Sequence, residues 1–373
     1  MGKQYELRLA GEPSRESQMR QGTASISAWR PTGPNDHQGF ELVDLSGNGA
    51  VRKPGRYAVK AKSNFLPPDA TADEAFRLTL QQCKWHIAAN IPAVVESHEV
   101  EGVHQLRVAL RRLRVALGAF GEEFRTPPLE ALRMRAKILA QGLAPARDLD
   151  VFMDALLEPA AQANGSVEAF AVLRARALVA RNEAWADAVR EASGLGFRTF
   201  LHDLEEAVDK RVWAESPRRR PSSKGLVVLE SPAVMLSNRM LSHRLSRARK
   251  HARQLKSLDE AGRHELRIAL KKLRYTAEFF APLYSEKAVR PFVKRLSRMQ
   301  DVLGLLQDVA VARKTLVLLV REPENSINGT RADLSFAAGM IYGWHLDRAH
   351  CAWRSAVRRW KRFAQVAPFW PVA

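Results

Sequence analysis

Apolar residues recur at helical spacing through most of this chain from Thr71 onward. Long segments place apolar side chains three and four residues apart and hold few Gly or Pro residues inside them, a pattern typical of amphipathic helices. Stretches containing Gly and Pro interrupt this pattern at 92–102, 121–128, 159–165, 217–232, 258–262, 282–286 and 323–329. The interruptions outline about eight helices, and the predicted fold class is all-α.

Residues 1–70 have a different texture. Gly and Pro recur throughout this segment, and the apolar stretches between them are short. Such a composition favours irregular structure or short strands over helices. We therefore expect a short N-terminal segment over 1–70, followed by the helical part of the chain.

One helical segment occurs twice. The run HQLRVALRRLR from His104 matches HELRIALKKLR from His264 at a spacing of 160 residues, and the same spacing carries Asp148 onto Asp308. A register kept over about 45 residues indicates an internal duplication. We divide the helices into a first repeat (71–215) and a second repeat (216–373). Helices joined by short loops pack antiparallel, so each repeat is predicted to form an antiparallel four-helix bundle.

Charge adds a functional prediction to this fold. The chain carries 59 Lys and Arg against 40 Asp and Glu, a net charge of +19, which predicts a polyanionic partner or an anionic surface. The first repeat holds 18 basic and 21 acidic residues, whereas the second holds 31 and 12. Long-range attraction of an anion is therefore expected mainly from the second repeat.

The cations gather in stripes along helix faces, beside the leucines predicted to face the core. Residues three or four apart on a helix are about 5 to 6 Å apart, so each stripe is a row of repelling charges. Solvated helix faces usually alternate in sign, and several such rows therefore indicate an anion-binding surface. The candidate residues are His104, Arg107, Arg111, Arg114, Arg133 and Lys137 in the first repeat, and Arg239, His243, Arg247, Lys250, His264, Arg267, Lys271, Lys272, Arg274, Arg290, Lys294 and Arg298 in the second.

At these residues the chain resembles the CHAD family, whose name refers to the histidine that opens the duplicated motif. The resemblance spans about residues 71–371 and includes Arg147-Asp148-Leu-Asp150 and the closing Phe369-Trp370. It implies two four-helix bundles related by pseudo-twofold symmetry, with a basic surface or channel between them. It also implies binding of inorganic polyphosphate, association with polyphosphate granules, and no catalysis. One departure is Gln307, which stands where the first repeat has Arg147.

Residues 3–9 and 52–62 resemble remnants of a CYTH triphosphatase domain, which often precedes a CHAD domain. That family needs an alternating Glu-x-Glu-x-Lys run to hold metal and phosphate. Here only Glu6 followed by Arg8 remains. We therefore expect no triphosphatase activity.

Metal and cofactor chemistry find little support. Neither His104 nor His264 has a second His or a carboxylate four residues further on, as a helical metal face requires. Phosphate hydrogen bonding by the imidazoles, or their orientation by a carboxylate, both stay open. For Asp148 and Asp308, helix capping or pairing with a basic neighbour is favoured over metal ligation. No Walker loop, dinucleotide fingerprint or hydrolase motif is present, so we predict no metal, no cofactor and no catalytic residue.

Further patterns concern partners and location. Cys83 and Cys351 are too few for a disulfide framework, no apolar leader opens the chain, and the longest aliphatic run is 316–320. We expect a cytoplasmic protein with no membrane partner and, from the resemblance, a place at polyphosphate granules. The leading interpretation is non-enzymatic polyphosphate binding, and sequence-independent nucleic-acid binding is the alternative. The pattern leaves the oligomeric state open.

The aromatic residues near the C-terminus bear on that choice. Trp344, Trp353, Trp360, Phe363, Phe369 and Trp370 could form stacking platforms for bases, as in proteins that bind single-stranded nucleic acid. Their helical spacing and flanking Ala residues favour core packing instead.

Overall fold

A computed structural model describes residues 27–31, 40–44, 57–62, 65–165, 168–214, 228–321 and 331–371. The chain divides into two compact parts, Met1–Pro54 and Gly55–Ala373. In the first part, strands β1 (Ser27–Pro31) and β2 (Phe40–Asp44) pair antiparallel, with Trp29 opposite Leu42. This pair agrees with the expected short strands. The CYTH-like stretches 3–9 and 52–56 lie outside the described residues.

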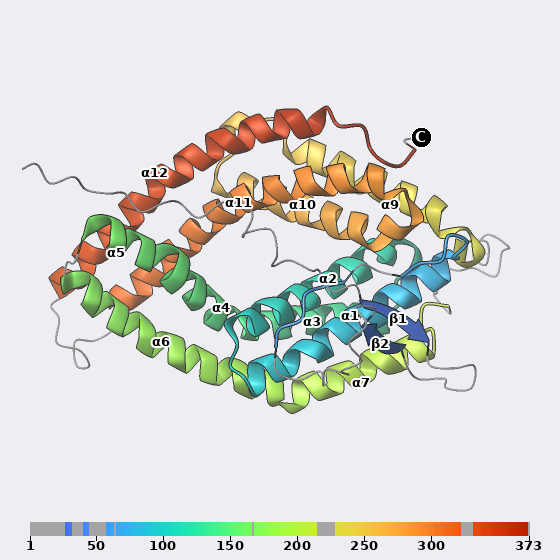
Figure 1. Ribbon diagram of the computed structural model, residues 1–373, viewed down its shortest axis with the longest axis horizontal. Coiled ribbons are helices and arrows are strands. Elements are labelled where there is room, and N and C mark those ends of the chain that lie inside the picture. Colours follow the sequence, from blue (N-terminus) through green and yellow to red (C-terminus); the bar gives the residue numbers. More distant parts are fainter. Residues whose placement is uncertain are drawn as a thin grey trace, which may run out of the picture. The chain divides into compact units, whose positions relative to one another are not determined.

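The second part is built from helices, which confirms the all-α prediction (Figure 1). Among its described helices, none combines the length and the apolar character that crossing a bilayer requires. The elements are α1 (Ala72–Val95), α2 (Val100–Phe124), α3 (Pro127–Gly142), α4 (Ala144–Val151), the π-helical turn η1 (Phe152–Leu157), α5 (Glu158–Asn164), α6 (Glu168–Ser193), α7 (Leu195–Asp209), α9 (Ala233–His251), η2 (Leu255–Ser257), α10 (Glu260–Phe280), η3 (Ala281–Leu283), α11 (Glu286–Arg321) and α12 (Arg331–Ala364).

Local sequence explains where several helices begin. Thr71 caps α1: its Oγ1 accepts a hydrogen bond from the Glu74 amide at 3.2 Å, and the Glu74 carboxylate accepts one from the Thr71 amide at 2.9 Å. This reciprocal pair is a capping box. Asp259 caps α10 by accepting from the Gly262 amide at 2.8 Å. This cap fixes the start of α10, the helix that carries the second copy of the basic motif.

The helix that follows the motif differs between the two repeats. In the second repeat α11 runs unbroken, whereas the matching stretch of the first is divided among α3, α4, η1 and α5. Pro145 and Pro159 stand there at the positions of Leu305 and Leu319, and proline disrupts a helix because it lacks the amide hydrogen. The helical periodicity did not predict this division at Leu143, nor the break at 194 between α6 and α7.

The described helices enclose three hydrophobic cores. The first is formed by α1, α2, α3, α6 and α7 together with the start of α9 and the end of α10, and the second lies among α9, α10, the first half of α11 and the end of α12. The third, like the first, takes residues from both repeats: Phe152 and Phe170 cluster with Leu316 and Ile341. Figure 1 shows α5 and the start of α6 beside the start of α12 at this end of the helical part. The two repeats therefore share core residues, and their division into two four-helix bundles related by pseudo-twofold symmetry stays a prediction.

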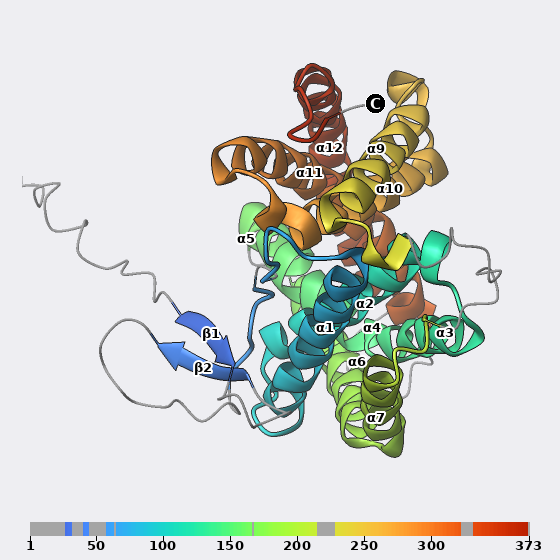
Figure 2. The same cartoon turned by 90° about the vertical axis from the view of Figure 1, so that its right-hand side faces the viewer.

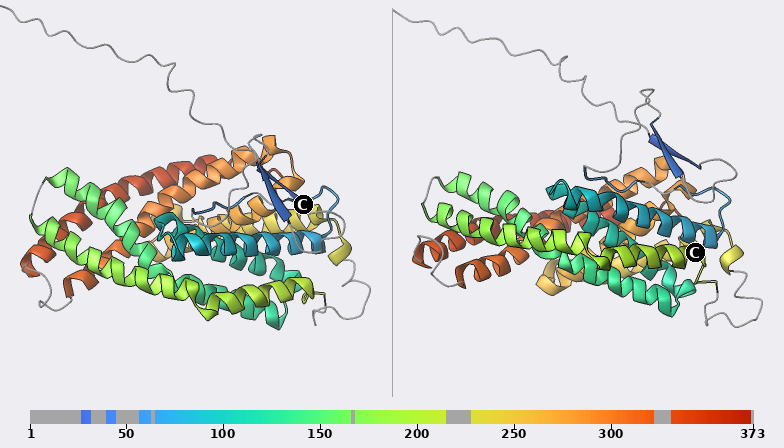
Figure 3. Two further views of the ribbon diagram at one scale, coloured as in Figure 1. Left: turned by 60° about the horizontal axis from the view of Figure 1, so that its bottom comes forward. Right: turned by 90° about the horizontal axis from the view of Figure 1, so that it is seen from below.

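The motif helices α2 and α10 pack against each other where the two repeats meet. The Phe120 and Phe280 rings are 5.5 Å apart, and Nη1 of Arg112 lies 2.5 Å from a carboxylate oxygen of Glu278. Figure 2 shows α9 to α12 above α1, α2 and α3. Figure 3 shows α6 and α7 following one another along one side of the helical part. The motif helices are thus central, which decides where their basic stripes lie.

Candidate anion-binding surface

Packing of α2 on α10 brings cations of both repeats together. Burial, and then the charge of Arg111, lowers the pKa of Arg267. Arg111 of α2 also acts on Lys271 of α10. Helices α2 and α10 are in contact, and Coulomb interactions weaken with distance, so these cations lie on neighbouring faces of two packed helices. The two predicted stripes form one basic surface, which we call the central cation group: Arg107, Arg111 and Arg147 of the first repeat with Arg267 and Lys271 of the second.

The surroundings of Lys271 disfavour the charged form of its amine. Burial lowers its pKa to about 6, with further repulsion from Arg111 and Arg267 and an opposing attraction from Asp308. In the protein alone, this amine is therefore mostly uncharged at neutral pH. A bound anion would restore its charge, because it would provide the counter-charge that the surroundings lack.

The first-repeat motif residues are partly engaged by the fold. Burial and the charge of Arg147 lower the pKa of His104 to about 4, against the opposing charge of Glu101. Burial lowers the pKa of Arg107 to about 10, against the nearby Asp148 carboxylate. Nη1 of Arg107 donates to the carbonyl oxygen of Ala140 at 2.6 Å. Arg107 therefore ties α2 to the end of α3 as well as facing the central group.

The two motif histidines have different surroundings. His264 is exposed, and its Nδ1 lies 2.5 Å from Oε1 of Gln307. His104 is half-buried beside Arg147, the residue that Gln307 replaces. An amide oxygen can accept a hydrogen bond from an imidazole, whereas an arginine only repels its charged form. The departure noted in the sequence thus makes the two repeats chemically unequal.

Two carboxylates meet inside the central group. Burial raises the pKa of Asp148 and of Asp308, against the charges of neighbouring cations, and the Asp148 charge itself acts on Asp308. Asp148 lies within α4 and Asp308 within α11, so the helix-capping prediction for them is wrong. The alternative, pairing with basic neighbours, agrees with Arg107 beside Asp148 and Arg267 beside Asp308.

A second group of cations continues from the first. Burial, followed by the charges of Arg133 and Arg111, lowers the pKa of Arg114. Burial, followed by Arg244, lowers the pKa of Lys272, and Arg247 and Arg114 add to this. Helices α2, α3, α9 and α10 therefore contribute to one continuous basic surface.

Arg147 and Arg244 belong to this surface but were not among the predicted residues. The signal for Arg244 was present, because residues 233–258 contain seven Lys or Arg and no acidic residue. Arg147 appeared in the sequence only through the family resemblance.

Other predicted cations already contact acidic side chains. Arg239 pairs with Glu123 at 2.6 Å, and Arg133 pairs with Glu130. Arg274 donates from Nε to Glu278 at 2.7 Å and from Nη1 to Gln300 at 3.1 Å. Arg274 thereby links α10 to α11, so its replacement would disturb packing as well as charge. The remaining predicted residues are exposed: Lys137 on α3, His243, Arg247 and Lys250 on α9, and Arg290, Lys294 and Arg298 on α11.

Most of the aromatic residues near the C-terminus lie in the hydrophobic core. Trp353, Trp360, Phe363 and Trp370 are buried in the second core, which confirms core packing over base stacking for these four. The groups that could hold a metal ion lie elsewhere: within the described ranges, His202, Asp203 and Glu206 of α7 come within reach of one another. Asp203 and Glu206 already pair with Arg135 and Lys210.

Comparison with known proteins agrees with this architecture. The family profile described as CHAD domain matches residues 79–317. The chain is similar to the crystal structure of the CHAD domain from the plant Ricinus communis, with 28% identity, a TM-score of 0.66, and coverage of 80% of this chain and 97% of that one. It is also similar to PptA from Streptomyces chartreusis, with 15% identity, a TM-score of 0.59, and coverage of 78% and 100%, a likeness of fold alone. No curated protein sequence matches it.

Proposed function

The chain belongs to the CHAD domain family, and from this membership and the central cation group we propose that it binds inorganic polyphosphate. One observation carries the proposal: α2 packs on α10, and burial, followed by the charge of Arg111 of the first repeat, lowers the pKa values of Arg267 and Lys271 of the second. The cations of the central group outnumber the two carboxylates beside them, Asp148 and Asp308, and this excess of like charge destabilises the protein alone. A chain of phosphates would neutralise them one after another.

The side chains present suit phosphate oxygens. Guanidinium groups donate two parallel hydrogen bonds to one phosphate, and a lysine ammonium acts as a compact charge. Arg111, Arg114 and Arg247 supply the first kind of contact, and Lys271 and Lys272 supply the second. Release of the counterions condensed on the polyanion adds a driving force that weakens with salt.

We favour polyphosphate over nucleic acid because the candidate site offers cations, whereas most of the C-terminal tryptophans that could stack on bases are buried. Sequence-tolerant binding of single strands relies on exposed aromatic rings that stack on bases. Here Trp353 and Trp360 are buried. Nucleic-acid binding through the same cations is the alternative.

The proposal includes a role at polyphosphate granules in the cytoplasm and no catalysis. We assign residues 71–215 and 216–373 as the two four-helix units of one CHAD domain. The CYTH-like origin of residues 3–9 and 52–62 is proposed from sequence alone.

A competition titration tests this function. Long-chain polyphosphate, single-stranded RNA and duplex DNA are compared at one salt concentration and equal total charge. Polyphosphate is expected to bind most tightly, with a salt slope of about 0.7 for each phosphate contacted if it behaves as a single-stranded polyanion. Equal or tighter RNA binding contradicts the proposal.

A further inference from the structure

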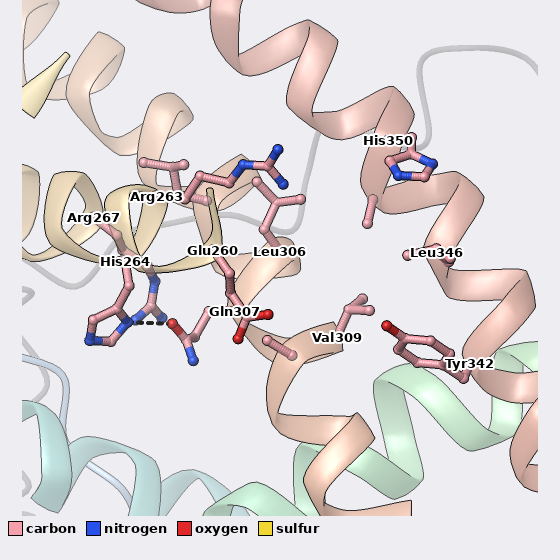
Figure 4. A pocket seen from close by; sticks show the side chains of 13 residues that line it. Glu260, Arg263, His264, Arg267, Leu306, Gln307, Val309, Tyr342, Leu346 and His350 are labelled. Atoms are coloured by element: carbon pink, nitrogen blue, oxygen red, sulfur yellow. Dashed lines mark hydrogen bonds between the residues drawn. The ribbon is translucent and has the colours of Figure 1, made fainter. Parts of the chain in front are cut away.

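A pocket in the second repeat lies beside the motif and extends away from it (Figure 4). Helix α10 lines one wall with polar side chains that include His264 and Arg267, and α12 lines the other with Tyr342 and Leu346. Leu306 of α11 lies between them. The pocket is therefore basic at one end, and at the other it combines apolar side chains with Tyr342 and His350.

The first repeat fills the corresponding position with a hydrogen-bonded network. Asp150 is buried, and its Oδ1 accepts from Nε of Arg181 at 2.6 Å and from Nε1 of Trp185 at 3.0 Å. The second repeat has Ala310 at the position of Asp150, and Ala310 lines the pocket. A carboxylate with two donors has thus been replaced by a methyl group and open space. The open space is therefore a feature of the second repeat, and the binding of a uniform polyanion does not require it.

The lining restricts the chemistry of an occupant. A bare phosphate would contact Arg267 and leave the apolar walls formed by Leu306 and Leu346 in water. A purely apolar molecule would offer no hydrogen-bond acceptor to Arg267 and nothing to Glu260 or Tyr342, whose hydroxyl points toward the centre of the lining in Figure 4. The suitable ligand carries phosphate at one end and a flat, mostly apolar group with hydrogen-bonding edges at the other.

We propose that this pocket binds a nucleoside polyphosphate. Its phosphates contact Arg267 and His264, and its base lies between Leu306 and Leu346. Glu260 accepts hydrogen bonds from the sugar hydroxyls or an exocyclic amine, and Tyr342 bonds a ring nitrogen. This goes beyond the proposed function because inorganic polyphosphate has no nucleoside. Since both ligands use Arg267, they exclude one another at this end of the basic surface.

Isothermal titration calorimetry with ATP, tripolyphosphate and adenosine tests the inference. ATP and tripolyphosphate have the same number of phosphates, but only ATP carries a base. We expect ATP to bind about tenfold more tightly than tripolyphosphate despite its lower charge, because the base removes apolar wall from water. ATP that binds no better than tripolyphosphate overturns the proposal.

Variants locate the effect. Ala310→Phe fills the pocket, so ATP should lose its advantage over tripolyphosphate while long-chain polyphosphate still binds. Leu346→Ala changes a side chain that is 37% exposed, which spares folding, and should weaken ATP about fivefold. Leu318→Ala on α11, 66% exposed and outside the pocket, is the matched control and should change nothing. Unchanged ATP affinity in Leu346→Ala contradicts the pocket assignment. If instead the unchanged protein binds ATP but not long-chain polyphosphate, the proposed function fails and the pocket assignment stands.

Discussion

Polyphosphate binding is expected to take up a proton, and Lys271 is the group that would accept it. Burial, followed by repulsion from Arg111 and Arg267, lowers the pKa of Lys271 to about 6 from an ordinary 10.5. A phosphate beside this amine stabilises the charged form and raises the pKa again. Affinity should therefore rise as the pH falls, because the anion binds the protonated lysine.

The size of the effect follows from the protonated fraction. With a pKa of about 6, about a quarter of Lys271 is charged at pH 6.5 and about 1% at pH 8. If the bound phosphate raises the pKa above 8, affinity should fall about 25-fold across this interval. Only the end groups of a long phosphate chain titrate in this range, so they contribute little.

Calorimetry in buffers of different ionisation enthalpy measures the proton count directly. At pH 7.5 the unchanged protein should take up close to one proton per binding event at this site, and Lys271→Met close to none. The same variant should lose about 25-fold more affinity at pH 6.5 than at pH 8. Lys250→Met, which removes an exposed lysine, is the matched control and should weaken binding equally at both pH values. Proton uptake that persists in Lys271→Met would refute the reasoning.

Three further outcomes are expected. In the first, stopped-flow kinetics compare two quadruple Ala variants, one at the exposed second-repeat cations Arg247, Lys250, Lys294 and Arg298 and one at Arg107, Arg111, Arg114 and Lys137. Polyphosphate association should slow more in the second-repeat variant, because the second repeat carries the net positive charge. Equal slowing would mean that the two repeats attract the anion symmetrically. In the second, thermal melts should show that stability is lost as the pH falls from 6.5 to 4. Burial lowers the pKa of His86 and His104 to about 4, so the unfolded chain is protonated first, which costs at most about 3 kcal/mol for each histidine. If stability falls as steeply with pH in the double variant His86→Gln and His104→Gln as in the unchanged protein, this explanation is wrong. In the third, urea unfolding of Arg112→Met should show a free energy of unfolding about 2 to 3 kcal/mol lower than that of the unchanged protein. The loss is limited to this size because Glu278 keeps Arg274 as a partner. A loss below about 0.5 kcal/mol would contradict a structural role for the Arg112–Glu278 pair.

The helices and the duplication could be read from the sequence because their causes are local. Side-chain spacing decides whether a segment is an amphipathic helix, and caps such as Asp259 act on the residues next to them. The stripe on α10 followed from the same periodicity. The breaks at Leu143 and Gly194 were missed because neighbouring residues there keep a helical pattern on both sides.

Tertiary structure alone decided which cations meet. Arg111 and Lys271 are 160 residues apart in the chain, and only the packing of α2 on α10 makes one depress the pKa of the other. The core that joins Phe152 to Leu316 likewise depends on contacts between the repeats. Periodicity records which face of each helix is basic, but it holds no information on what that face is set against. Burial and Coulomb interactions depend on distances in space, and the folded chain fixes those distances.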